Sequence, residues 1–200
     1  MIMNKITSTC LLAAVIVLGG LVPLRAQTSP QDQQKAMEAY MKAGAVTENH
    51  AFLKRFAGSW QAETTMWAFP GQPPTTSQNP FEGKMILGGR FVSLSYNGTM
   101  MGQPFEGFQI IGYDNLQKKF ITLWIDNSST AFFLLAGPRE ADKEVINQKG
   151  ELPDPTTGGM SKVRAVVTFS GPDSYVFEQF MGLPDGKEFK SMDMRCTRKK

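Results

Sequence analysis

The chain has very little cysteine and histidine, with two cysteines and one histidine among 200 residues. Cys10 lies before the expected cleavage point of an export signal, so Cys196 would be the single cysteine of the mature chain. A lone cysteine forms no internal disulfide, and the fold must therefore rest on its hydrophobic core. One histidine and one cysteine without clustered carboxylates make poor metal ligands, so we expect no metal site and no cofactor.

The sequence also lacks an excess of charge of one sign. Its 21 Lys and Arg residues and 18 Asp and Glu residues give a net charge of +3. Removal of residues 1–26 would take away Lys5 and Arg25 and leave +3 − 2 = +1. A nearly neutral chain carries no electrostatic footprint for nucleic acid or an anionic membrane, and we expect neither as a partner.

No apolar run is long enough for a typical membrane span. The longest, from Leu11 to Leu24, is interrupted by Gly19-Gly20 and Pro23 and is shorter than the roughly 20 residues that a span needs. The small residue Ala26 follows, as signal peptidase requires. Residues 1–26 therefore predict a cleaved export signal, and the mature protein is expected in the periplasm or secreted. An uncleaved membrane anchor is the alternative. The short signal and the lack of disulfides favour a bacterial source.

Catalytic motifs are absent: the sequence contains no P-loop, dinucleotide fingerprint or G-x-S-x-G elbow. The sole histidine, His50, precedes the predicted strands, so a Ser-His-Asp triad would have to recruit it from outside the sheet. Glu82 and Glu106 are the best carboxylate pair. On alternate strands they would lie about 9.5 Å apart, near the upper limit for inverting glycosidases. Exposed edge charges are the simpler interpretation, and no catalytic residue is assigned.

What is present divides the mature chain in two. Residues 27–57 form a helical leader, with one helix predicted from Pro30 to Gly44 and a shorter one from Thr47 to Ala57. Residues 58–200 contain about ten short strand-like segments separated by turn residues such as Gly88-Gly89 and Asn97-Gly98. These segments are Trp60–Phe69, Phe81–Leu87, Arg90–Tyr96, Phe105–Tyr113, Lys119–Asp126, Thr130–Ala136, Glu144–Gly150, Lys162–Phe169, Ser174–Met181 and Glu188–Arg198.

Short strands without crossover helices predict an all-β fold with an antiparallel sheet. We expect an up-and-down barrel of about ten strands, and a sandwich is the alternative. A repeat supports the barrel: "PFEGKMILGG" from Pro80 returns 24 residues later as "PFEGFQIIGY" from Pro104. This spacing places the two copies on alternate strands, with Gly83 and Gly107 as matched bends in a curved sheet. Chance similarity is the alternative.

Several dispersed motifs carry a resemblance to a known family. They include "FLKRFAGSW" from Phe52, "GGRF" from Gly88, "MMGQPFEG" from Met100 and "GYDN" from Gly112. Together they resemble the uncharacterised family called domain of unknown function 1579, from about His50 to Arg198. That family is grouped with the calycin-like barrels of lipocalins and fatty-acid-binding proteins. The resemblance implies a calycin-like barrel and supplies no established activity or catalytic residues.

The ends of the predicted barrel suggest a closure. In a closed meander the first strand pairs with the last, which sets Trp60 opposite the end of the chain. A guanidinium over the indole, from Arg195 or Arg198, would contribute about 1 kcal/mol and seal one end, as in lipocalins. We assign the closure to Trp60 and Arg198. A solvated basic tail is the alternative.

A barrel of this size is wide enough to leave a cavity. Strand alternation sets Phe120, Thr122 and Trp124 on one face, which we expect to point inward. The aliphatic residues between them would then face outward, beneath the helical leader with Phe52, Leu53 and Phe56. The alternative puts the aliphatic face inside and Trp124 beneath the leader. The candidate pocket residues are Trp124, Arg90, Asp126, Arg164, Tyr113 and Trp60. The alternative makes Asp126 a turn residue and leaves the arginines exposed.

The sequence thus predicts an exported barrel that binds a small, mostly apolar ligand without catalysis. An enzyme of the same fold that uses cavity carboxylates and arginines is the second hypothesis. A filled barrel that serves as a scaffold for protein interaction is the third. The identity of the ligand and the oligomeric state remain open.

Overall fold

A computed structural model describes residues 29–100, 102–154 and 157–200. The predicted signal at residues 1–26 lies outside this range. The chain divides into two compact units, Met1–Met37 and Glu38–Lys200. Helix α1 (Pro30–Ala43) begins in the first unit and has no buried residue. Ser29 starts it, because its Oγ accepts a hydrogen bond from the Asp32 backbone N–H at 3.2 Å.

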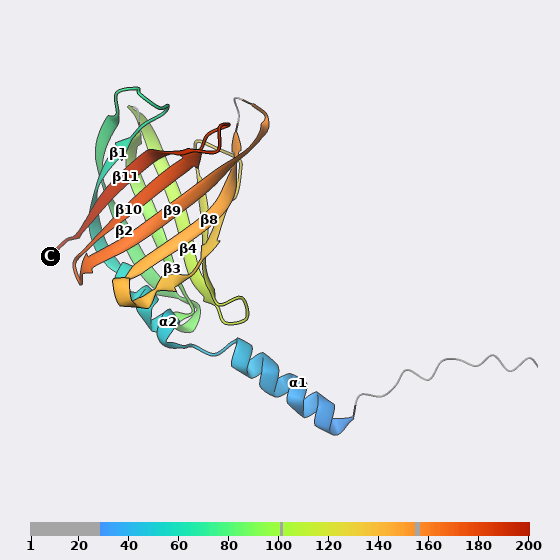
Figure 1. The fold of residues 1–200 in the computed structure, drawn as a ribbon. Helices are drawn as coiled ribbons and strands as arrows, with labels where there is room; N and C mark the ends of the chain where they lie inside the picture. The colour runs from blue at the N-terminus through green and yellow to red at the C-terminus, as the bar shows by residue number, and fades with distance from the viewer. Residues whose placement is uncertain (1–28, 101, 155–156) are drawn as a thin grey trace, which may run out of the picture. The chain divides into compact units, whose positions relative to one another are not determined.

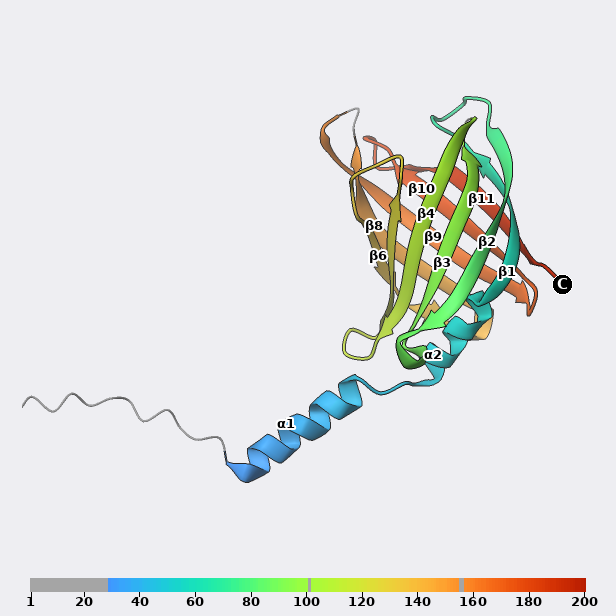
Figure 2. The ribbon, with the colours of Figure 1, turned by 180° about the vertical axis from the view of Figure 1, so that it is seen from behind.

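The second unit is a closed antiparallel barrel (Figures 1 and 2). Ten strands follow one another in the order of the chain, and a pairing of β6 with β8 closes the ring. The two-residue strand β7 (Arg139–Glu140) pairs with β8. This arrangement confirms the predicted all-β up-and-down barrel. The strands are β1 (Gly58–Met66), β2 (Thr75–Ile86), β3 (Phe91–Met100), β4 (Gln103–Asp114), β5 (Lys119–Asp126), β6 (Phe133–Gly137), β8 (Val145–Asp154), β9 (Gly159–Gly171), β10 (Ser174–Gly182) and β11 (Glu188–Arg198).

Alternation along the strands builds the core. In β9, for example, Val163, Ala165, Val167 and Phe169 are buried while the residues between them are more exposed. Tight turns join neighbouring strands at the end where β1 begins. Between β2 and β3, Gly88 has a φ of 66°, a left-handed conformation that glycine adopts without strain.

Several strand boundaries differ from the prediction, and those of β2 and β3 affect the site. Strand β2 begins at Thr75 rather than Phe81, since its polar first half pairs with the second half of β1. Strand β3 continues to Met100, so the predicted turn at Asn97-Gly98 is wrong. Asn79 stabilises this extension, because its Oδ1 accepts a hydrogen bond from the Thr99 N–H at 3.1 Å.

A short helical segment plugs one end of the barrel. It consists of α2 (Glu48–Phe52) and the 3₁₀ helix η1 (Leu53–Phe56), and Figure 1 shows it at the end where β1 begins. Phe52, Leu53 and Phe56 are buried within the main hydrophobic core. The expectation that these three side chains cover the outward aliphatic residues of β5 is therefore wrong: they insert into the barrel end, where apolar burial is greater.

His50 belongs to this plug. Its side chain is buried, and its Nδ1 accepts a hydrogen bond from the Thr47 N–H at 3.0 Å. The ring lies edge-on to Tyr113, with centroids 5.8 Å apart. Burial lowers the pKa of His50, a hydrogen bond to the Tyr113 backbone opposes this shift, and the charge of Arg90 adds to it. The histidine therefore stays neutral and caps a helix.

The two copies of the repeat lie on alternate strands that run in the same direction, β2 and β4, with β3 between them. Their glycines make room for close neighbours. A Cβ on Gly83 would lie 2.0 Å from the Phe56 carbonyl oxygen, and one on Gly107 would lie 2.5 Å from the Trp124 ring. Gly83 therefore leaves room for the plug, and Gly107 leaves room for Trp124.

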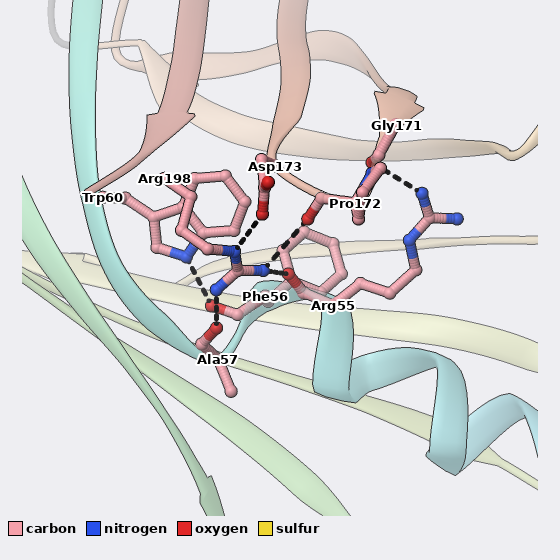
Figure 3. Close-up of polar contacts among 8 residues, drawn as sticks. All are labelled: Arg55, Phe56, Ala57, Trp60, Gly171, Pro172, Asp173 and Arg198. Atoms are coloured by element: carbon pink, nitrogen blue, oxygen red, sulfur yellow. Dashed lines mark hydrogen bonds and ion pairs between the residues drawn. The ribbon is translucent and has the colours of Figure 1, made fainter. Parts of the chain in front are cut away.

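Arg198 joins the first and last strands of the barrel at the plugged end (Figure 3). It pairs with Trp60 across β1 and β11, and its guanidinium lies 4.2 Å from the indole centroid. The indole Nε1–H donates to the Phe56 carbonyl oxygen at 3.0 Å, which attaches Trp60 to the plug.

The same guanidinium also binds the backbone around it (Figure 3). It donates to the Ala57 carbonyl and, at 3.1 and 3.2 Å, to those of Arg55 and Pro172. Asp173 accepts from its Nε at 3.0 Å. One side chain thus connects the plug, the last strand and the β9–β10 turn.

We predict that Arg198→Ala lowers the free energy of unfolding by about 2–4 kcal/mol, because it removes several charge-assisted hydrogen bonds and the cation–π contact. Arg198→Lys should recover only part of this loss, since an ammonium lacks the planar fork. Urea unfolding of both variants measures the effect, with exposed Arg195→Ala as the control. Equal stability of the alanine variant and the parent would contradict the assignment.

Candidate functional site: the barrel cavity

The barrel contains a cavity of about 310 Å³. Its walls are the inner faces of the strands. The cavity lies between the plug and the loops that follow β1, β3 and β5. Most lining side chains are apolar or aromatic, and they include the flexible methionines Met66, Met100, Met192 and Met194. The other lining residues are Phe56, Ala62, Thr64, Ser77, Asn79, Tyr96, Asn97, Phe105, Gln109, Ile111, Thr122, Trp124, Asp126, Ser128, Phe133, Leu135, Ile146, Gln148, Leu152, Val167, Tyr175, Phe177 and Gln179.

Trp124 forms an aromatic wall of the cavity. Its ring is stacked with Phe105 at a centroid distance of 6.2 Å and edge-on to Tyr96 at 5.2 Å. Gly107, on the neighbouring strand, leaves the space that the indole occupies. Thr122 also lines the cavity, so the inner face of β5 is the one that carries Trp124.

Asp126 lies on the same face, at the end of β5. Its Oδ2 accepts a hydrogen bond from the Trp124 indole N–H at 2.6 Å, which fixes the orientation of the ring. Its Oδ1 accepts from the backbone N–H and the hydroxyl of Ser128, at 2.9 and 2.6 Å. Asp126 therefore both lines the cavity and organises the β5–β6 turn.

Two internal networks satisfy polar groups deeper in the barrel. Thr122 donates to the Gln148 Oε1 at 2.9 Å, and the Gln148 amide donates to the Phe120 carbonyl at 3.0 Å. The Tyr175 hydroxyl hydrogen-bonds with Tyr96 and with the thiol of Cys196. Burial raises the pKa of Cys196 to about 12, so its thiol is uncharged.

The two candidate arginines lie outside the cavity. Arg164 stands between the buried Val163 and Ala165, so alternation turns it outward, over Phe180 at 3.9 Å and paired with Glu188. Arg90 is exposed at the plugged end, where its Nε donates to the Gly44 carbonyl at 3.1 Å.

The two remaining candidates occupy the plugged end. Tyr113 is on the inner face of β4, but it packs against His50 and Phe120 instead of lining the cavity. Trp60 is fully buried and stacks on Phe81 beneath Arg198. Of the six candidate pocket residues, the structure brings Trp124 and Asp126 together at the cavity.

Several lining residues were not recognised in the sequence. Ser77 and Asn79 lie in the polar first half of β2, which lacks the apolar alternation of a predicted strand. Gln109 and Gln148 do have a signal: each is a polar residue on an inward-facing position of an otherwise apolar strand. Register counting from Ile111 or Ile146 would have identified them.

Carboxylates are sparse at the cavity. Glu82 and Glu106 are exposed, and Asp126 is the one carboxylate that lines the cavity among the described residues. Among residues 29–100, 102–154 and 157–200, no three His, Cys, Asp or Glu side chains are grouped so that they could hold a metal ion. In the same residues, no helix has the length and apolar character needed to cross a membrane.

Residues 45–198 match the family model described as "Protein of unknown function (DUF1579)". The chain belongs to this family. The match confirms the resemblance found in the sequence and covers the plug and the whole barrel of this DUF1579 protein. No curated protein matches the chain.

Among solved structures, this DUF1579 protein is similar to the S-type phycobiliprotein lyase CPES from Guillardia theta. The two share 12% identity over 80% of this chain and 97% of the lyase, with a TM-score of 0.54. A redesigned β-barrel has 14% identity over 78% of this chain and all of its own, with a TM-score of 0.41. EF1p2_mFAP2b bound to DFHBI has 12% identity over 75% of this chain and 98% of its own, with a TM-score of 0.43. The likeness to the lyase shows the fold alone.

We predict that Gly107→Ala displaces the Trp124 indole, because its methyl group would lie 2.5 Å from the ring. Such overpacking costs about 1–3 kcal/mol and should alter the near-ultraviolet circular dichroism of the tryptophan. Gly159→Ala is the control, since its methyl group would meet only the Thr157 hydroxyl at 3.5 Å. An unchanged Trp124 signal in Gly107→Ala would disprove the tight fit.

Proposed function

We propose that this DUF1579 protein is exported and binds a small, mostly apolar ligand in its barrel, without catalysis. The cavity of about 310 Å³, with largely apolar walls, is the observation that carries the proposal. A volume of this size is within the range of small-molecule sites, which combine apolar walls with a few polar groups.

The two other hypotheses receive less support. A filled scaffold would have side chains throughout its interior, whereas this barrel has a cavity beside Trp124. An enzyme that uses cavity carboxylates and arginines would need a free carboxylate near the ligand. Asp126, the lining carboxylate, accepts hydrogen bonds on both oxygens, and Glu82 and Glu106 are exposed on the outer surface.

Titration of mature protein with the apolar dye N-phenyl-1-naphthylamine tests the proposal. We expect dye emission to rise and Trp124 emission to fall as the dye enters the cavity. Trp124→Phe should abolish the tryptophan response while the dye still binds. Trp67→Phe is the matched control, because Trp67 follows β1 and does not line the cavity. A lack of saturable binding would refute the proposal.

Export is tested separately. In a bacterial host, the full chain should accumulate outside the cytoplasm with an N-terminus near Gln27, because the apolar run from Leu11 acts as a cleavable signal. Fractionation followed by N-terminal mass spectrometry measures this. Arg substitutions in the apolar run, at Leu12 and Val15, should keep the chain inside the cell. Uncleaved chain in the membrane fraction of the parent would instead favour an anchor.

A further inference from the structure

We propose that the cavity selects uncharged ligands and that the Gln109 side-chain amide hydrogen-bonds the ligand's polar atom. This inference rests on the proposed function, because it specifies the chemistry of the same site. It follows from which charged and polar groups line the cavity and which of them already have partners.

The cavity has no cation for an anionic ligand. No lysine, arginine or histidine lines it among the residues that the structure describes. The two arginines expected there bind elsewhere, Arg90 to the Gly44 carbonyl and Arg164 to Glu188. A carboxylate or sulfonate would enter without a counter-ion, and an unpaired buried charge costs several kcal/mol.

The cavity offers little to a cationic ligand as well. Its one carboxylate, Asp126, accepts hydrogen bonds from the Trp124 indole and from Ser128. A ligand ammonium would have to compete with these contacts and would disturb the ring that forms the wall. Burial raises the pKa values of Tyr96 and Tyr175 well above their usual range, so both phenols remain neutral and supply no further anion.

Gln109 differs from the other glutamines of the cavity. Gln148 binds Thr122 and the Phe120 carbonyl, and Gln179 binds Ser191. Gln109 lines the cavity and makes no side-chain hydrogen bond with any residue in the described part of the chain.

The position of Gln109 suits contact with a ligand. It pairs with Trp124 across β4 and β5, so its amide and the aromatic wall face the same space. A neutral amide offers two donors and one acceptor, which match a hydroxyl, carbonyl or amine of an uncharged molecule. A planar apolar body against Trp124 and one polar atom at Gln109 describe the expected ligand.

A matched pair of dyes tests whether the cavity selects uncharged ligands. N-phenyl-1-naphthylamine is neutral, and 8-anilino-1-naphthalenesulfonate carries the same rings with one added anionic group. Mature protein should bind the neutral dye at least tenfold more tightly. Only binding that quenches Trp124, and whose quenching is lost in Trp124→Phe, counts as cavity binding, since exposed Phe108 and Leu134 offer another apolar surface.

Substitution of Gln109 tests its role with the same dyes. Gln109→Arg should raise the affinity for the sulfonate at least tenfold and reverse the preference, because it supplies the missing cation. Gln109→Leu should weaken binding of the neutral amine dye several-fold and leave 1-benzylnaphthalene, which has no N–H, unaffected. Thermal unfolding of both variants checks that they fold. Gln109→Leu should lose little stability, because Gln109 makes no side-chain hydrogen bond in the described part of the chain, whereas the unpaired charge of Gln109→Arg should lower its stability until the sulfonate binds.

The outcomes separate the two proposals. If neither dye binds in the cavity, the proposed function fails. If the sulfonate binds and quenches Trp124 as strongly as the neutral dye, ligand binding stands, and the proposed selection of uncharged ligands is overturned. If Gln109→Arg folds but leaves the sulfonate affinity unchanged, Gln109 does not contact the ligand, and that assignment is overturned.

Discussion

The insertion of a short helical segment into one end of the barrel is the interaction on which the rest of the structure depends. Phe52, Leu53 and Phe56 fill the interior of the barrel at that end. Burial of three such side chains stabilises the fold by several kcal/mol, since each contributes about 1.5–3 kcal/mol. Because the plug takes up this apolar surface, the cavity is confined to the other part of the barrel.

The plug also explains why the first and last strands must meet. Trp60 binds the plug through the Phe56 carbonyl, and Arg198 covers Trp60 while it binds the plug backbone. The seam between the first and last strands joins residues far apart in the sequence, and a contact that holds both strands and the plug stabilises the ring there.

Much of this architecture could be predicted from the sequence. Short segments with hairpin turns predict the antiparallel barrel, and alternation predicts that Phe120, Thr122 and Trp124 share one face of β5, although both faces are too apolar for the sequence to decide which one points inward. The side-chain positions of Arg90 and Arg164 could not be predicted, because a polar residue beside a glycine turn or between apolar neighbours fits either face. The strand register decides this choice: burial of Val163 and Ala165 turns Arg164 outward. The polar half of β2 was missed because cavity-lining serine and asparagine look like loop residues.

The burial of Cys196 has a practical consequence. Its thiol is enclosed beside Tyr175, and its pKa of about 12 keeps it protonated, so alkylating and oxidising reagents meet an unreactive group. A chain that begins at Gln27 has no other cysteine. A cysteine introduced in the loop after β1 or the loop after β5 can therefore be labelled selectively with a dye or spin probe, without first removing the native one. Cysteines in both loops would allow the distance between them to be measured.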